Sequence, residues 1–80
     1  MKITIKTFAA LKEYFPPTFE FESASILTVS DVKKELIRTK PETNNILSVS
    51  RFAVNDVFVN ESTPVNDQTT VCIIPPSSGG

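Results

Sequence analysis

The sequence predicts one α+β domain, in which a mixed sheet has one long helix packed across one face. Three observations support this fold class. Residues 2–7 and 18–22 alternate between apolar and polar side chains, which is the pattern of half-buried strands. The segment between Thr28 and Pro41 repeats apolar side chains every three or four positions, as an amphipathic helix does. Residues 69–74 are rich in β-branched side chains and predict a last strand.

The chain begins with a strand and a short helix. Ile3 and Ile5 share one face of the strand at residues 2–7, and we expect that face to be buried. Good helix formers follow in residues 8–15. Apolar residues recur there at spacings of three and four: Phe8, Leu11 and Phe15. The proline pair at residues 16–17 should end this helix, because proline cannot continue one.

A second strand and the long helix come next. In residues 18–22 the two phenylalanines should face the core and the two glutamates should face water. Thr28 is the expected N-cap of the helix, and Asp31 would complete a capping box. The apolar stripe of the helix should face the sheet: Val29, Val32, Leu36 and Ile37. The basic residues on its remaining surface are expected to be solvated: Lys33, Lys34 and Arg38.

Two polar segments connect the later elements. Residues 42–50 read as a connection with room for one helical turn, pinned by Ile46 and Leu47. Residues 60–68 have the composition of a loop, and Val65 is the expected apolar anchor of that loop.

The remaining elements predict a hairpin and a central pair of strands. Short β-rich runs at 51–54 and 57–59 flank Asn55-Asp56, a pair that suits a type I′ turn. There are too few helices for an alternating parallel α/β fold. The first and last strands can instead lie side by side in parallel at the centre of the sheet. This topology is the β-grasp, or ubiquitin-like, fold, and we assign it to residues 1–74.

Composition narrows the possible functions. The net charge is −1 with both signs interspersed, whereas a nucleic-acid surface needs a basic face. No apolar run approaches the roughly 18 residues of a membrane span. The sequence has no histidine and no cluster of metal ligands, so a Ser–His or Cys–His nucleophile pair is impossible. We therefore do not expect the chain to be an enzyme by itself. A single cysteine allows no internal disulfide and indicates the reducing cytoplasm.

Residues 75–80 read as a flexible tail. The chain has only two glycines, Gly79 and Gly80, where average usage of about 7% would give roughly five or six. Glycine has no Cβ, so this end can lie extended in a narrow tunnel. The proline pair before it cannot join a sheet ladder and should end the last strand. A frayed terminus is the alternative interpretation.

Three stretches match a known pattern. Residues 8–13 read Phe-Ala-Ala-Leu-Lys-Glu, residues 53–55 read Ala-Val-Asn, and residues 74–80 read Ile-Pro-Pro-Ser-Ser-Gly-Gly. With these motifs the whole chain resembles the ubiquitin-like sulfur carriers, most closely the family of molybdopterin synthase small subunits. That family has arginine where this chain has Lys12, and often Asp-Gly-Asp where this chain has Asn66-Asp67-Gln68. Sulfur carriers of the thiazole pathway also end in Gly-Gly but are usually shorter and lack the Pro-Pro.

The resemblance implies a carrier chemistry at the end of the tail. An activating enzyme that uses ATP and magnesium would join the carboxylate of Gly80 to AMP. The acyl adenylate would then become a thiocarboxylate with sulfur from a donor. The large synthase subunit, in a heterotetramer, would take up the tail and pass the sulfur to a cyclic pyranopterin monophosphate in molybdenum cofactor biosynthesis. In this scheme Gly80 carries the sulfur, Gly79 lets the tail thread, and the chain itself binds no cofactor.

The resemblance also implies partner-binding residues: Phe8, Phe58, Ile74, Pro75, Pro76, Ser77 and Ser78. For Phe8 and Phe58, burial in the core is an equal alternative. Ile74 should face away from the helix by the alternation of its strand, and so should Cys72. We expect Cys72 to pack as a small hydrophobe or at an interface; a redox or sulfur-relay thiol is the weaker alternative.

Other functions remain compatible with the sequence. The chain could carry sulfur for thiazole synthesis or tRNA thiolation instead. It could also be a ubiquitin-like protein modifier that forms an isopeptide bond through Gly80, because both chemistries begin with the same acyl adenylate. A β-grasp domain that only mediates interactions would leave the terminal glycines unexplained.

Overall fold

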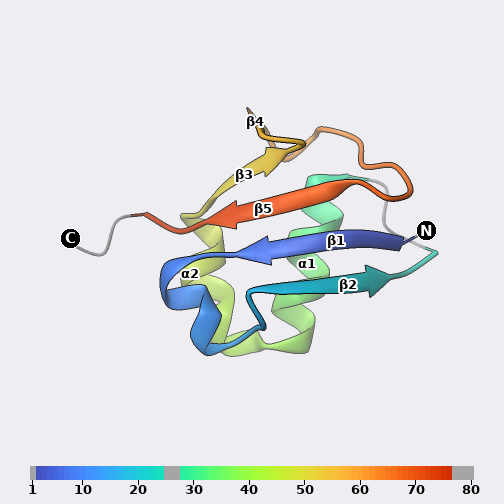
Figure 1. Cartoon of the computed structure of the whole chain (residues 1–80). Helices are drawn as coiled ribbons and strands as arrows, with labels where there is room; N and C mark the ends of the chain where they lie inside the picture. The colour runs from blue at the N-terminus through green and yellow to red at the C-terminus, as the bar shows by residue number, and fades with distance from the viewer. Residues whose placement is uncertain (1, 25–27, 77–80) are drawn as a thin grey trace.

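The computed structural model describes residues 2–24 and 28–76, and they form a five-stranded mixed sheet with two α-helices on one face (Figure 1). The strands are β1 (Lys2–Thr7), β2 (Thr18–Glu22), β3 (Arg51–Val54), β4 (Val57–Val59) and β5 (Thr70–Ile74). The helices are α1 (Val29–Thr39) and α2 (Asn44–Ser48), with the 3₁₀ helices η1 (Ala9–Glu13) and η2 (Pro41–Thr43).

The first and last strands form the centre of the sheet. The strand order is β2-β1-β5-β3-β4, and β1 and β5 are parallel while the other neighbours are antiparallel. The register places Ile5 opposite Val71 and Thr7 opposite Ile73. The predicted α+β class and the β-grasp topology are therefore confirmed.

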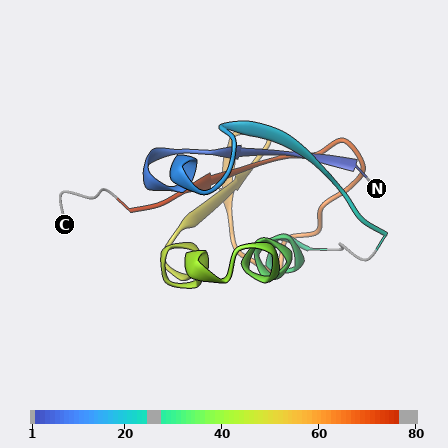
Figure 2. The same ribbon diagram turned by 90° about the horizontal axis from the view of Figure 1, so that it is seen from below.

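The core lies between the sheet and the two helices (Figure 2). Its residues come from every layer: Ile3, Ile5, Leu11, Phe15, Val29, Val32, Leu36, Leu47, Phe52, Val65, Val71 and Ile73. Phe19 and Phe21 pack partly buried against this cluster. The faces predicted from the two sequence periods are thus the buried ones, and Val65 is the anchor of its loop.

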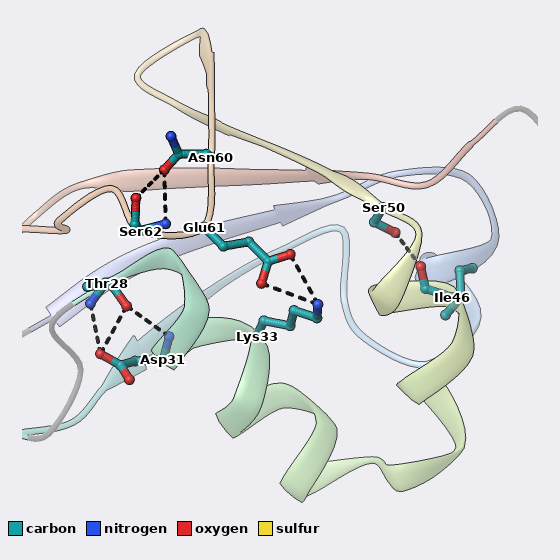
Figure 3. A network of polar contacts seen from close by, with 8 residues as sticks. All are labelled: Thr28, Asp31, Lys33, Ile46, Ser50, Asn60, Glu61 and Ser62. Atoms are coloured by element: carbon teal, nitrogen blue, oxygen red, sulfur yellow. Dashed lines mark hydrogen bonds and ion pairs between the residues drawn. The ribbon is translucent and has the colours of Figure 1, made fainter.

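The first turn of α1 is capped within the chain. The backbone N–H of Thr28 donates to the Asp31 carboxylate at 2.9 Å, and the Asp31 N–H donates to Thr28 Oγ1 at 3.3 Å (Figure 3). The backbone N–H of Val29 donates to the carbonyl of Thr63 at 3.0 Å, and the N–H of Ser30 donates to the carbonyl of Glu61 at 2.8 Å. The predicted capping box is present, and the loop after β4 accepts the two remaining N–H groups of the first turn.

Two expectations for the helical layer need correction. The prediction of one helix is incomplete, because the turn expected near Ile46 and Leu47 forms α2 beside α1. Lys33 is not solvated: its side chain is 17% exposed and pairs with Glu61 at 3.1 Å (Figure 3). The local pattern around Lys33 gave no sign of this pair, since Glu61 is 28 residues away in the sequence.

The short helix after β1 differs from its prediction in type and length. Phe8 remains extended (φ −135°, ψ 160°), and Ala9 turns into the left-handed region (φ 53°) before η1 continues to Glu13. This break prevents a helix from beginning at Phe8, and so short a segment favours the tighter 3₁₀ form. The buried hydroxyl of Thr7 donates to the Pro16 carbonyl at 3.0 Å and closes the loop behind η1.

Several turns use left-handed residues other than glycine. Asn55 (φ 50°) and Asp56 (φ 71°) form the hairpin turn between β3 and β4, as predicted for a type I′ turn. Gln68 (φ 67°) takes the same region just before β5. Its Cβ makes this conformation unfavourable by about 1 kcal/mol.

Candidate functional site

The face of the sheet opposite α1 and α2 carries the residues that the sequence singled out. On β5, Val71 and Ile73 are completely buried toward the helices, so Cys72 and Ile74 point to the opposite side. We call this side the open face. Around the end of β5 it comprises Lys6, Phe8, Arg51, Ala53, Phe58, Cys72 and Ile74.

An apolar row crosses the open face from the centre of the sheet to its edge. Cys72 lies opposite Lys6 on β1 and opposite Ala53 on β3, and Ala53 lies opposite Phe58 on β4. Cys72 and Ala53 are 9% and 5% exposed, whereas Phe58 is 54% exposed. Cys72 is therefore a packed thiol between its neighbours, and the row becomes accessible at Phe58.

A second apolar group lies where β1 and β5 end together. The extended backbone of Phe8 continues β1 one residue beyond the pair Thr7 and Ile73, which brings it level with Ile74. The side chain of Phe8 is 42% exposed, and Ile74 is partly exposed. Phe8 and Phe58 are therefore not buried in the core, which was the alternative to an exposed position that a partner could contact.

A cation lies at the same end of the open face. Arg51 is opposite Ile74 across the β3–β5 pair. Its guanidinium carbon is 4.2 Å from the ring centroid of Phe58, the distance of a cation–π contact. Stacking on the ring orders the long side chain, so the positive charge is held beside the apolar residues.

The tail begins at this end. Pro75 is buried and Pro76 is exposed, and neither belongs to a strand. Packing thus continues one residue beyond β5. The predicted carrier and threading residues, Gly80 and Gly79, lie outside the described residues, and so do Ser77 and Ser78.

The open face offers contact surface and charge. Within residues 2–24 and 28–76 no three histidine, cysteine or acidic side chains gather as a metal site, and no helix is long and apolar enough to cross a membrane. On α1, Glu35 and Arg38 shift each other's pKa. A hydrogen bond from Arg38 lowers the pKa of Glu35, and the same bond raises the pKa of Arg38.

A β-grasp domain with an apolar face beside the start of its C-terminal segment is the architecture of a ubiquitin-like carrier. The ThiS family model matches residues 5–80. The chain therefore belongs to the ThiS family of ubiquitin-like sulfur carriers. No curated protein matches the sequence.

Solved structures agree on the fold. The small archaeal modifier protein SAMP1 of Haloferax volcanii superposes with a TM-score of 0.82 at 19% identity, with all of both chains covered. A putative molybdopterin converting factor subunit 1 of Pyrococcus furiosus gives 0.82 at 20% identity, over 94% of this chain and 97% of that one. One chain in a complex of subunits 1 and 2 of the molybdopterin-converting factor of Helicobacter pylori gives a TM-score of 0.71 at 21% identity. The match covers all of this chain and all of that one.

Sequence reasoning did not single out Arg51. Its significance comes from the register, which puts it opposite Ile74, and from its contact with Phe58 across the hairpin. The predicted hairpin contained the necessary signal, because pairing 51–54 with 57–59 around a two-residue turn already places these side chains on one face.

Proposed function

We propose that the chain is the sulfur-carrier subunit of a molybdopterin synthase. The observation that carries the proposal is the combination of ThiS-family membership with a Pro-Pro-Ser-Ser-Gly-Gly segment directly after the central strand β5. The molybdopterin converting factors among the similar structures support this choice within the family.

In the proposed mechanism the domain docks and the tail reacts. A partner that binds the open face would contact Phe8, Phe58 and Ile74, at the point from which the tail starts. Six extended residues, 75–80, span about 20 Å at roughly 3.4 Å each. A partner on the open face can therefore receive the carboxylate of Gly80 in an active site well away from the docking surface.

The chemistry would take place on Gly80 in two stages. An activating enzyme with ATP and magnesium would form the acyl adenylate and release pyrophosphate. Sulfur delivered by a donor at the oxidation level of sulfide would then displace AMP and leave a thiocarboxylate. In the large subunit this sulfur would pass to a cyclic pyranopterin monophosphate, and the carboxylate of Gly80 would be regenerated for another cycle.

The intact mass of the protein isolated from its own cells tests the proposal. A fraction should be heavier by the difference between one sulfur and one oxygen atom, and fragmentation should place the change on Gly80. The same spectrum shows whether Gly80 is the last residue of the mature chain. Absence of the heavier form from cells that make molybdenum cofactor would contradict the proposal.

Substitution in the tail tests the threading role of Gly79. Gly79→Val should abolish adenylation or sulfur transfer, because a branched Cβ would clash in a narrow channel. The melting temperature should not change. Asn45→Val places the same branched side chain at an exposed position of α2, outside the tail and the open face, and it should retain transfer. Normal delivery of sulfur by Gly79→Val would show that no narrow channel exists.

A protein modifier is the second candidate. The similarity to the small archaeal modifier protein of Haloferax volcanii, with a TM-score of 0.82, favours it. A modifier would leave conjugates of higher mass on denaturing gels of cell extract, and deletion of Gly80 would remove them. A carrier for thiazole synthesis or tRNA thiolation would instead copurify with the enzymes of those pathways.

A further inference from the structure

An open hollow of about 530 Å³ adjoins the open face at the edge of the sheet. It is lined by Arg51, Phe58, Val59, Asn60 and Thr63. The lining combines an aromatic ring and an aliphatic side chain with groups that can hydrogen-bond. Such a hollow can receive a side chain that has both an apolar stem and a polar end.

Arg51 brings an unneutralised charge to the hollow. None of the ion pairs formed within residues 2–24 and 28–76 includes Arg51. Phe58 covers one face of the guanidinium at 4.2 Å. The N–H groups lie in the plane of the guanidinium and point away from its faces, so the stacked group keeps its donors for an acceptor.

Asn60 adds a second oriented donor. Its Oδ1 accepts hydrogen bonds from the backbone N–H of Ser62 at 3.0 Å and from the Ser62 hydroxyl at 2.5 Å. The Thr63 hydroxyl approaches the same oxygen at 3.5 Å. These bonds fix the amide plane, and Figure 3 shows the side-chain nitrogen of Asn60 turned away from Ser62. The nitrogen can only donate.

Two donors in one hollow select an acceptor that carries negative charge. A carboxylate matches the fork of a guanidinium and forms stronger hydrogen bonds than a neutral acceptor does. The methylene groups of an acidic side chain would contact Phe58 and Val59. A phosphate dianion would be only half neutralised by Arg51. The charge and the lining therefore favour a single carboxylate of a protein surface.

We propose that the hollow receives an aspartate or glutamate side chain of the protein that docks on the open face, with Arg51 and Asn60 as specificity-determining residues. This inference rests on the proposed function, because it describes the surface that the tail-accepting partner would contact. The hollow is continuous with that surface through Phe58 and through Arg51, which lies opposite Ile74.

The test uses the full chain and the molybdopterin synthase large subunit of the same organism. Asn60→Asp keeps an oxygen for the bonds from Ser62 but replaces the donor with an anionic acceptor. Arg51→Glu replaces the positive charge of the hollow with a negative one. Each should raise the Kd by about tenfold or more, because like charges would then meet in the hollow. Melting temperatures should stay within a few degrees of the wild type.

Asn45→Asp is the matched control. It makes the same chemical change at an exposed position of α2, in the helical layer on the opposite side of the sheet. The Kd of this variant should stay within about twofold of the wild type. When the acidic surface residues of the large subunit are replaced by lysine one at a time, one such variant should restore binding to Arg51→Glu. Equal weakening by Asn45→Asp and Asn60→Asp would overturn the proposal.

The outcomes separate this inference from the proposed function. If Ile74→Asp prevents binding while Asn60→Asp and Arg51→Glu bind normally, the open face docks the partner but the hollow holds no carboxylate. If the wild type does not bind the large subunit, the proposed function and this inference fail together. Loss of binding in both hollow variants, with a normal Asn45→Asp, supports the carboxylate site.

Discussion

The two faces of the sheet use the same strands for different purposes. On the helix-covered face, Ile5, Val71 and Ile73 are completely buried. On the open face Phe8 and Phe58 are 42% and 54% exposed. Both sets are apolar, so composition alone does not separate them. The cover of α1 and α2 accounts for the complete burial of the first set, whereas Phe8 and Phe58 have no such cover.

We therefore expect stability and partner binding to depend on different side chains of the same strand. Along β5 successive side chains belong to opposite faces, so a shift of one residue moves a substitution from the core to the surface. The face that packs against the helices specifies the register. The open face is free of this packing constraint, and it carries the partly exposed Phe58 and the cation of Arg51.

The largest expected contrast is between Ile73→Asp and Ile74→Asp. A buried, unpaired carboxylate costs several kcal/mol, which is comparable with the roughly 5 kcal/mol that stabilises a small domain. Ile73→Asp should therefore abolish the cooperative thermal transition followed by circular dichroism. The free energy of unfolding of Ile74→Asp should stay within about 1 kcal/mol of the wild-type value, but this variant should no longer bind the large subunit.

The pair is its own control, because the two variants carry the same substitution at adjacent positions. If Ile74→Asp unfolds the domain as Ile73→Asp does, then Ile74 belongs to the core and the two-face description is wrong. If Ile74→Asp is stable and still binds, docking does not use this end of the open face.

A smaller effect is expected from loosening the cover of the buried face. Thr28→Ala removes the hydroxyl that accepts the Asp31 N–H and should cost about 1 kcal/mol. For a domain of this size that lowers the melting temperature by roughly 4–8 °C. Partner affinity at 25 °C should not change, because the open face is untouched. Thr39→Ala, at the exposed C-terminal end of α1, is the control and should be nearly neutral.

Much of the fold was predictable because it depends on local patterns. Alternation in β5 assigned Val71 and Ile73 to the core, and the spacing of Thr28 and Asp31 predicted the N-cap. The Asn55-Asp56 turn fixed the hairpin, because these residues tolerate positive φ. Each of these signals lies within a few residues of the structure that it specifies.

Other features depended on contacts between distant segments. The pairing of Lys33 with Glu61 required the loop after β4 to lie over α1, which no local pattern states. The exposure of Phe8 could not be decided from spacing, because it depends on whether the backbone at Ala9 continues a helix or turns away. The hollow beside Arg51 joins β3, β4 and the following loop, so it exists only in the folded domain.

The smallest predicted effect concerns the turn that leads into β5. Gln68 holds a left-handed conformation (φ 67°), and its backbone N–H donates to the carbonyl of Lys2 at 2.6 Å. The neighbouring Asp67 accepts the backbone N–H of Lys2 at 2.8 Å. These bonds tie the turn to the start of β1, so the conformation is retained although a Cβ disfavours it. The turn lies at the opposite end of β5 from the tail.

Gln68→Gly should stabilise the domain by about 0.5 kcal/mol, because glycine adopts positive φ without strain but loses more backbone entropy on folding. Gln68→Ala keeps the Cβ and should not stabilise it, which separates backbone strain from the loss of the glutamine side chain. Denaturant melts of the three proteins measure the difference. Affinity for the large subunit should stay the same in both variants, since the turn shares no residue with the open face. Stabilisation by alanine equal to that by glycine would mean that the backbone at Gln68 is not strained, and an altered affinity would mean that the turn and the open face are coupled.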